Sequence, residues 1–121
     1  MEMWRIKKGL EKTSGWASII WVDYKVRDKV YFYKGSFGSL VGTVDDAKKI
    51  FILASTENII LNSYNSKDLK FFKIKPEMVY CIDFVTKEIK SLFKAKMKQK
   101  VIYANGYKFA EVGEYYLPMY A

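Results

Sequence analysis

The stretch GWASIIWVDYKVRDKVYFYKG, residues 15–35, decides the fold class. It holds two runs rich in β-branched and aromatic residues, which pack well on the pleated surface of a sheet. The charged pair Arg27 and Asp28 joins the two runs. Short runs of this kind with turn residues between them are typical of antiparallel sheets, so we predict a β-hairpin here.

Similar short runs follow along the rest of the chain, separated by polar or turn-forming residues. They are SLVGTV, KKIFILAS, NIILNSYN, LKFFKI, MVYCIDFV and KVIYANGYKFAEV. The last run contains Asn105 and Gly106, which are a strong hairpin signal because both central residues of a type I′ turn need a positive φ. We therefore predict one mainly β domain over residues 1–121, built as a single antiparallel barrel or sandwich.

Two segments could form helices, so the predicted domain has zero to two of them. Residues 44–54 have a possible N-cap in Thr43, although the packed run IFIL favours a buried strand. Residues 87–99 follow a possible N-cap at Thr86 and are rich in good helix formers. Their apolar residues fit a helix and a strand equally well, and both alternatives stay open.

The formal net charge is +8, from 21 Lys and Arg against 13 Asp and Glu. Residues 67–108 hold eleven Lys but only four acidic residues. A clustered excess of this kind favours binding to a polyanion, although a general preference for lysine in the genome would explain the same composition. Only two of the basic residues are Arg, which argues against bidentate reading of guanine edges.

The segment SLFKAKMKQK, residues 91–100, places Lys94, Lys96, Lys98 and Lys100 on alternate positions. In a strand, alternate side chains point to the same face, so these four ammonium groups would form one row. Such a row could contact a phosphate backbone, or it could only protect an edge strand from aggregation. In a helix, the lysines of this segment would still form a basic stripe.

Aromatic residues alternate with lysine in KVYFYK, residues 29–34. On a strand, Lys29, Tyr31 and Tyr33 would share one face. Aromatic rings stack on bases while ammonium groups follow the phosphates, as in single-stranded nucleic-acid platforms. Together with Tyr107 and the lysine row, these residues form our predicted nucleic-acid-binding site. Tyr and Lys are also ordinary residues on an exposed sheet face.

The residue types present exclude much catalytic chemistry. The chain has no His and one Cys, which excludes His-based acid–base catalysis, His-containing zinc sites and an internal disulfide. We predict no catalytic residue, metal site or cofactor, and a non-catalytic protein. One alternative is a metal-dependent nuclease that uses a (D/E)-x-K motif, such as Asp23 with Lys25 or Glu88 with Lys90. Another is a protein-interaction or structural β domain, possibly viral.

The single cysteine and the lack of a long apolar run favour an intracellular, cytoplasmic location without a membrane span or a disulfide partner. Cys81 lies in a largely apolar run, where we expect a buried thiol. Asp83, at the end of the same run, is expected to cap a turn or to pair with a Lys; the alternative is a carboxylate in apolar surroundings, as at functional sites. We also predict a homodimer if an edge strand is free, with nucleic acid as the main partner.

Overall fold

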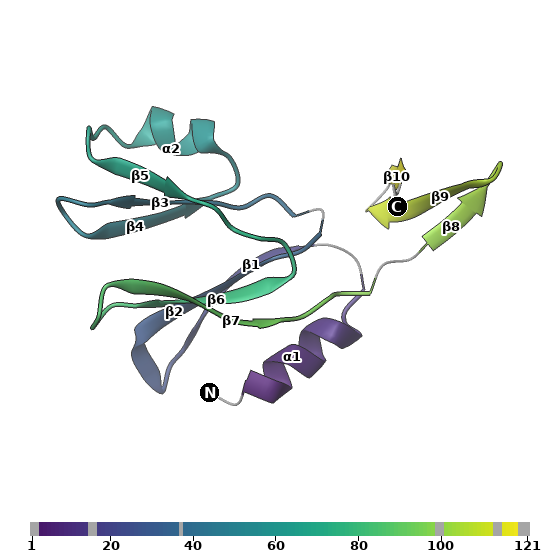
Figure 1. Cartoon of the computed structure of the whole chain (residues 1–121), viewed down its shortest axis with the longest axis horizontal. Coiled ribbons are helices and arrows are strands. Elements are labelled where there is room, and N and C mark those ends of the chain that lie inside the picture. The colour runs from purple at the N-terminus through teal and green to yellow at the C-terminus, as the bar shows by residue number, and fades with distance from the viewer. Residues whose placement is uncertain (1–2, 15–16, 37, 99–100, 113–114, 119–121) are drawn as a thin grey trace.

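The computed structural model describes residues 3–14, 17–36, 38–98, 101–112 and 115–118. It is mainly β, as predicted, with two helices and three antiparallel sheets in the described chain (Figure 1). The elements are α1 (Met3–Lys12), β1 (Ser18–Asp23), β2 (Val26–Lys34), β3 (Val41–Asp45), β4 (Ile50–Ala54), α2 (Glu57–Ser63), β5 (Leu69–Phe72), β6 (Met78–Asp83), β7 (Glu88–Lys94), β8 (Val101–Ala104), β9 (Tyr107–Val112) and β10 (Tyr115–Pro118). The sheets have the strand orders β1-β2-β6-β7, β4-β3-β5 and β10-β9-β8.

The two sheets formed by β1 to β7 pack face to face as a sandwich, with a helix on each outer side (Figure 1). Between the sheets, Phe32 stacks on Tyr80 with ring centroids 5.1 Å apart and also contacts Phe72 of the second sheet. Leu10 of α1 packs on the opposite face of the four-stranded sheet. Ile60 of α2 is buried against the three-stranded sheet. Of the two predicted architectures, the described strands form the sandwich.

Neither helix lies where a helix was considered possible. Residues 44–54 form most of the β3–β4 hairpin, and residues 87–99 contribute β7. The run NIILNSYN, which was predicted as a strand, forms most of α2 instead. The hydroxyl of Thr56 accepts a hydrogen bond from the backbone N–H of Ile59 at 3.4 Å, so Thr56 is the N-cap that starts this helix.

The predicted hairpin of β1 and β2 is present, but its turn lies earlier in the chain than Arg27 and Asp28. Asp23 pairs with Val26, and its carboxylate accepts a hydrogen bond from the backbone N–H of Lys25 at 3.0 Å. Aspartate favours such turns because its side chain can bond to the backbone two residues later. The turn at Asn105 and Gly106 is as predicted, with φ values of 50° and 79°.

Both residues singled out in MVYCIDFV take their expected places. Cys81 is a buried free thiol, and burial is the main cause that raises its pKa. The carboxylate of Asp83 accepts hydrogen bonds from the backbone N–H groups of Val85 and Thr86, at 2.9 and 3.3 Å. Asp83 therefore caps the turn between β6 and β7, and the bond from Val85 is the main cause that lowers its pKa.

A buried carboxylate, that of Asp45, holds the turn between β3 and β4. It accepts a hydrogen bond from the Tyr64 hydroxyl at 2.6 Å and one from the backbone N–H of Lys48 at 3.2 Å. The bond from Tyr64 connects the end of β3 to the residue that follows α2, and the bond from Lys48 closes the β3–β4 turn. The Tyr64 bond is the main cause that lowers the pKa of Asp45 below its usual value.

We expect the Asp45→Asn variant to unfold at a lower urea concentration than the wild type at pH 7, and the difference to shrink at pH 3. A carboxyl group with a lowered folded-state pKa stabilises the fold above its unfolded pKa of about 3.9. It loses that contribution as the pH falls through the folded-state value. Urea unfolding at both pH values checks this, with the exposed Asp68→Asn as control. If Asp45→Asn lost the same stability at both pH values, the stabilising contribution would not come from the ionised carboxylate.

The third sheet, of β8, β9 and β10, projects from the sandwich (Figure 1). The single domain over residues 1–121 therefore stays a prediction for this part of the chain. No helix within the described ranges is long and apolar enough to cross a membrane.

Candidate nucleic-acid interface

The two ends of the sandwich differ in charge. The turns after β1, β3 and β6 and the start of β5 meet at one end, on the left in Figure 1. Acidic and basic residues are mixed there: Asp23, Asp28, Asp45, Asp46, Asp68, Asp83 and Glu88 lie among Lys25, Arg27, Lys29, Lys48, Lys49, Lys67, Lys70, Lys87 and Lys90. Asp46 forms ion pairs with Lys49 and Lys70, at 3.2 and 2.9 Å. Positive charge at this end is largely compensated.

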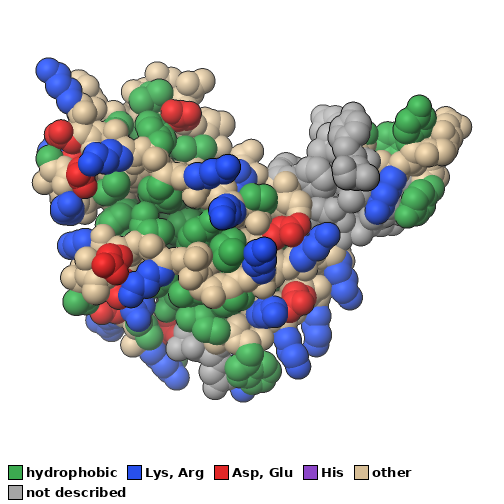
Figure 2. Space-filling view, in the orientation of Figure 1, with side chains coloured by type: hydrophobic (Ala, Val, Ile, Leu, Met, Phe, Trp, Pro, Cys, Tyr) green, Lys and Arg blue, Asp and Glu red, His purple; other side chains and the backbone are tan. Residues whose placement is uncertain are grey.

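The other end is strongly basic. It comprises α1, the connections after β2 and β5, and the segment after β7. Its described basic residues are Arg5, Lys7, Lys8, Lys12, Lys34, Lys73, Lys75, Lys94, Lys96 and Lys98, and its described acidic residues are Glu11 and Glu77, with Glu57 at the start of α2 on the same side. Figure 2 shows Lys and Arg side chains gathered over this part of the surface. We call this surface the basic end.

The predicted lysine row lies at the basic end. Lys94, Lys96 and Lys98 are exposed, whereas Ala95 and Met97 between them are only 2% and 5% exposed. The alternation predicted for a strand is therefore present, although β7 itself ends at Lys94. Lys100 lies outside the described residues.

An extra residue in β7 decides which way the row faces. Ser91 pairs with Tyr80 and Phe93 pairs with Val79, so Leu92 between them forms a bulge. One additional residue moves all later side chains to the opposite face of a strand. A regular strand over this segment would also place Lys90 on the face of the row, as we expected from the alternation. Lys90 instead lies on the opposite face, because the sequence pattern does not reveal the bulge.

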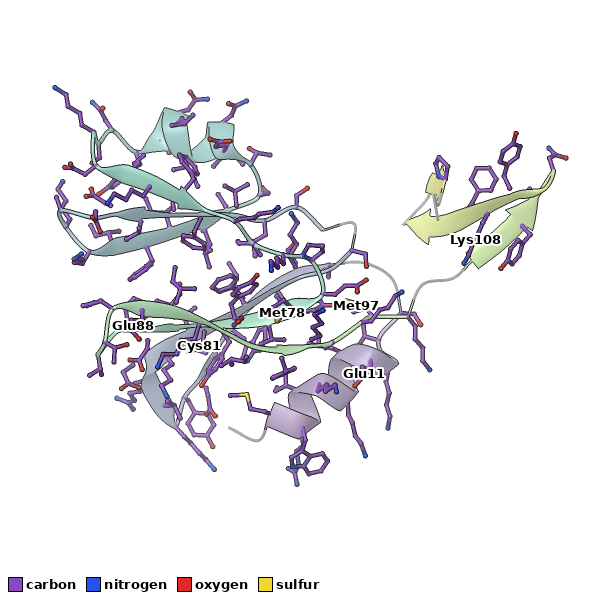
Figure 3. The ribbon with its side chains drawn as sticks, in the orientation of Figure 1. Glu11, Met78, Cys81, Glu88, Met97 and Lys108 are labelled. Atoms are coloured by element: carbon purple, nitrogen blue, oxygen red, sulfur yellow. The ribbon has the colours of Figure 1, made fainter. Side chains whose placement is uncertain are left out.

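Three hydrogen bonds fix the backbone of the row. The buried Tyr33 hydroxyl donates to the carbonyl oxygen of Ala95 at 2.6 Å, and the Ala95 N–H donates to the carbonyl of Glu77 at 2.9 Å. The Lys98 N–H donates to the carbonyl of Thr13, just after α1, at 2.9 Å. Met97 packs with Leu10 between the sheet and α1 (Figure 3). The row is thus held in one position by the body of the protein.

Tyr31 and Tyr33 are not available for stacking on bases. Their exposed fractions are 3% and 0%. Tyr31 stacks on Trp21 with ring centroids 5.8 Å apart, and Tyr33 belongs to the core beneath α1. The expectation of an exposed tyrosine face on this strand is wrong because Tyr33 packs beneath α1 and Tyr31 packs against Trp21 of the neighbouring strand.

The remaining predicted site residues lie away from the row. Lys29 pairs across the sheet with Asp83, at the end where charges are mixed. Tyr107 is 68% exposed but belongs to β9 in the projecting sheet. The structure therefore brings together Lys94, Lys96 and Lys98 from the predicted set.

Comparisons of the chain with protein-family models, with curated proteins and with solved structures find no match. Across the described ranges, no group of three Cys, Asp or Glu side chains is arranged to hold a metal ion. The function therefore has to be argued from the basic end.

The N-terminal helix contributes residues that the sequence reasoning missed. Trp4 is 57% exposed, and the guanidinium of Arg5 and the ammonium of Lys8 lie 5.3 and 5.5 Å from its ring centroid. The spacing of Ile6 and Leu10 by four residues, with charged residues around them, is the signal that could have indicated an amphipathic helix.

Proposed function

We propose that the protein is a non-catalytic nucleic-acid-binding protein whose basic end contacts the phosphate backbone without regard to sequence. The observation that carries the proposal is the separation of charge between the two ends of the sandwich. A surface of one charge sign attracts a polyanion over long distances. Phosphate contacts position a nucleic acid but read no bases, which suits a surface rich in lysine.

The fixed lysine row supports this proposal. Alternate residues of an extended segment lie about 6.6 Å apart, so the three ammonium groups are spread along a line. The hydrogen bond from Tyr33 to Ala95 holds the backbone between them. A preordered row loses less conformational entropy on binding than lysines on a mobile loop would.

Trp4 favours single strands as the ligand. Stacking of an aromatic ring on a base contributes about 1–3 kcal/mol, and a duplex does not offer its base faces. The exposed ring of Trp4 lies beside two cationic groups on α1. In this proposal, Trp4 takes the stacking role that the sequence pattern gave to Tyr31 and Tyr33.

We expect replacement of Lys94, Lys96 and Lys98 by Gln to weaken nucleic-acid binding and to reduce its salt dependence. Each lost phosphate contact lowers the slope of log K against log salt by about 0.9 on duplex and 0.7 on single strands. The triple variant should therefore lose about 2.1 units of slope on single strands and about 2.7 on duplex. Fluorescence anisotropy with labelled single-stranded and duplex oligonucleotides, at about 50 and 200 mM salt, measures this.

The matched control replaces Lys48, Lys67 and Lys87 by Gln, because these three exposed residues lie at the other end. Both triple variants have the same net charge. Equal losses in the two variants would mean that total charge, not the basic end, attracts the ligand. No binding by the wild type at the lower salt concentration would end the proposal. The intracellular location and the homodimer stay predictions, and analytical ultracentrifugation would determine the oligomeric state.

A further inference from the structure

An apolar groove lies between α1 and β1. Its volume is about 240 Å³. Arg5, Ile6, Gly9 and Leu10 line it on the helix side, and Ile19 and Trp21 line it on the strand side. Pockets that enclose a drug-sized ligand are usually larger, at roughly 300–1,000 Å³, so this groove has the size for a side chain rather than for a whole ligand.

Gly9 keeps the helix side of the groove open. Glycine in the interior of a helix is unfavourable compared with alanine. Neither conformation nor packing requires it here, because its φ is not positive and an added β-carbon would have no heavy atom within 4 Å. The missing side chain leaves the space next to Ile19 and Trp21 unfilled.

The strand side of the groove is a sheet edge. Within the described sheet β1 pairs with β2 alone, so its other edge is open. Ile19 and Trp21 face the groove, whereas Ile20 and Val22 on the opposite face are 50% and 64% exposed. β1 has no Lys or Pro, the residues that commonly protect an edge from pairing.

Trp21 adds a buried polar group at the groove. Its indole N–H is buried and has no hydrogen-bond partner in the described part of the chain. An unpaired buried donor is unfavourable.

We propose that this groove binds an extended peptide of a partner protein, which adds to the sheet as a strand beside β1. An added strand forms main-chain hydrogen bonds with the edge and directs alternate side chains into a pocket, which gives specificity. One apolar side chain would enter the groove between Gly9 and Trp21. The next would cover Ile20 and Val22 on the other face.

Charge determines which peptide fits. Arg5 lines the groove, and Lys8 and Lys12 are exposed on the same helix. These cations favour a peptide with acidic residues next to its apolar ones. A second copy of this chain is a poorer partner, because it would bring another net charge of +8 and another basic helix to the same edge.

The test uses a pool of labelled heptapeptides in which valine, isoleucine, leucine or phenylalanine alternates with threonine between terminal aspartates. We expect the wild type to bind members of this pool in anisotropy titrations. Gly9→Leu fills the groove and should weaken binding at least about tenfold. Asn58→Leu adds the same side chain to α2 and should bind like the wild type. Gly9→Leu should melt no lower than the wild type, so that loss of binding is not loss of folding.

Two changes to the peptides test the binding mode. Methylation of alternate backbone nitrogens blocks strand pairing and should abolish binding. Peptides with terminal lysines in place of the aspartates should bind the wild type more weakly. The same peptides should bind the Arg5→Glu variant more tightly than they bind the wild type. The proposal is overturned if no peptide binds, if Gly9→Leu binds as well as the wild type, or if the methylated peptides bind equally well.

Discussion

Gly42→Val is expected to lower the free energy of unfolding by about 3 kcal/mol or more, or to prevent folding. Gly42 is buried in β3, and a β-carbon at this position would overlap the ring of Phe72 on β5. That ring cannot move away freely, because it lies between the sheets with its centroid 6.3 Å from that of Phe32. Urea unfolding followed by circular dichroism measures the loss.

Two further variants make this prediction specific. Gly9→Ala is the matched control, because a β-carbon there meets no heavy atom within 4 Å. It should stabilise the protein by about 1 kcal/mol through helix propensity alone. Adding Phe72→Leu to a Gly42→Ala variant should recover part of the loss, since the shorter side chain leaves room. Wild-type stability of Gly42→Val would show that the core is not packed as described.

Removal of the Tyr33 hydroxyl is the second change with a large expected effect. Tyr33→Phe keeps the buried ring but leaves the carbonyl oxygen of Ala95 without its 2.6 Å hydrogen bond. An unsatisfied buried group of this kind costs about 1–3 kcal/mol. Tyr33→Ala removes the ring as well and should cost about 3–5 kcal/mol. Tyr24→Phe, on a side chain that is 78% exposed, should change little.

Tyr33→Phe also distinguishes the effect of the position of the lysine row on binding from the effect of its charge. Tyr33→Phe keeps all three lysines, so the salt slope of nucleic-acid binding should stay as in the wild type. The affinity should fall because the row is no longer held in one position. A stability equal to that of the wild type would show that the hydroxyl does not anchor this segment.

The fold class could be predicted from local patterns, and the helices could not. β-Branched runs and the pair Asn105–Gly106 act within a few residues, so they can be read directly from the sequence. α1 has three apolar residues at helical spacing, Met3, Ile6 and Leu10, but a ten-residue helix depends on packing for its stability, so this pattern is a weak signal. α2 contains isoleucines that favour strands, and the cap at Thr56 and the burial of Ile60 outweigh that preference.

The candidate site was partly predictable, because some of its features depend on local sequence and others on contacts between distant residues. The alternation of Lys94, Ala95 and Lys96 is local, so exposure and burial along this segment follow from the sequence. The burial of Tyr33 depends on Leu10 of α1, and that of Tyr31 depends on Trp21 of β1, so both depend on contacts with other elements. The direction of the row depends on the bulge at Leu92, which exists only in the pairing of β7 with β6.

The contact between α1 and the lysine segment has a consequence for synthesis on the ribosome. α1 is made before the strands on which it packs, and its packing partners Ala95 and Met97 are among the last residues of the sandwich to be made. A helix this short is marginal alone, so α1 depends on these contacts and on its earlier-made neighbours Ile19, Trp21 and Tyr33. Because the contacts with Ala95 and Met97 join distant parts of the chain, we expect complete docking of α1 to be a late step of folding.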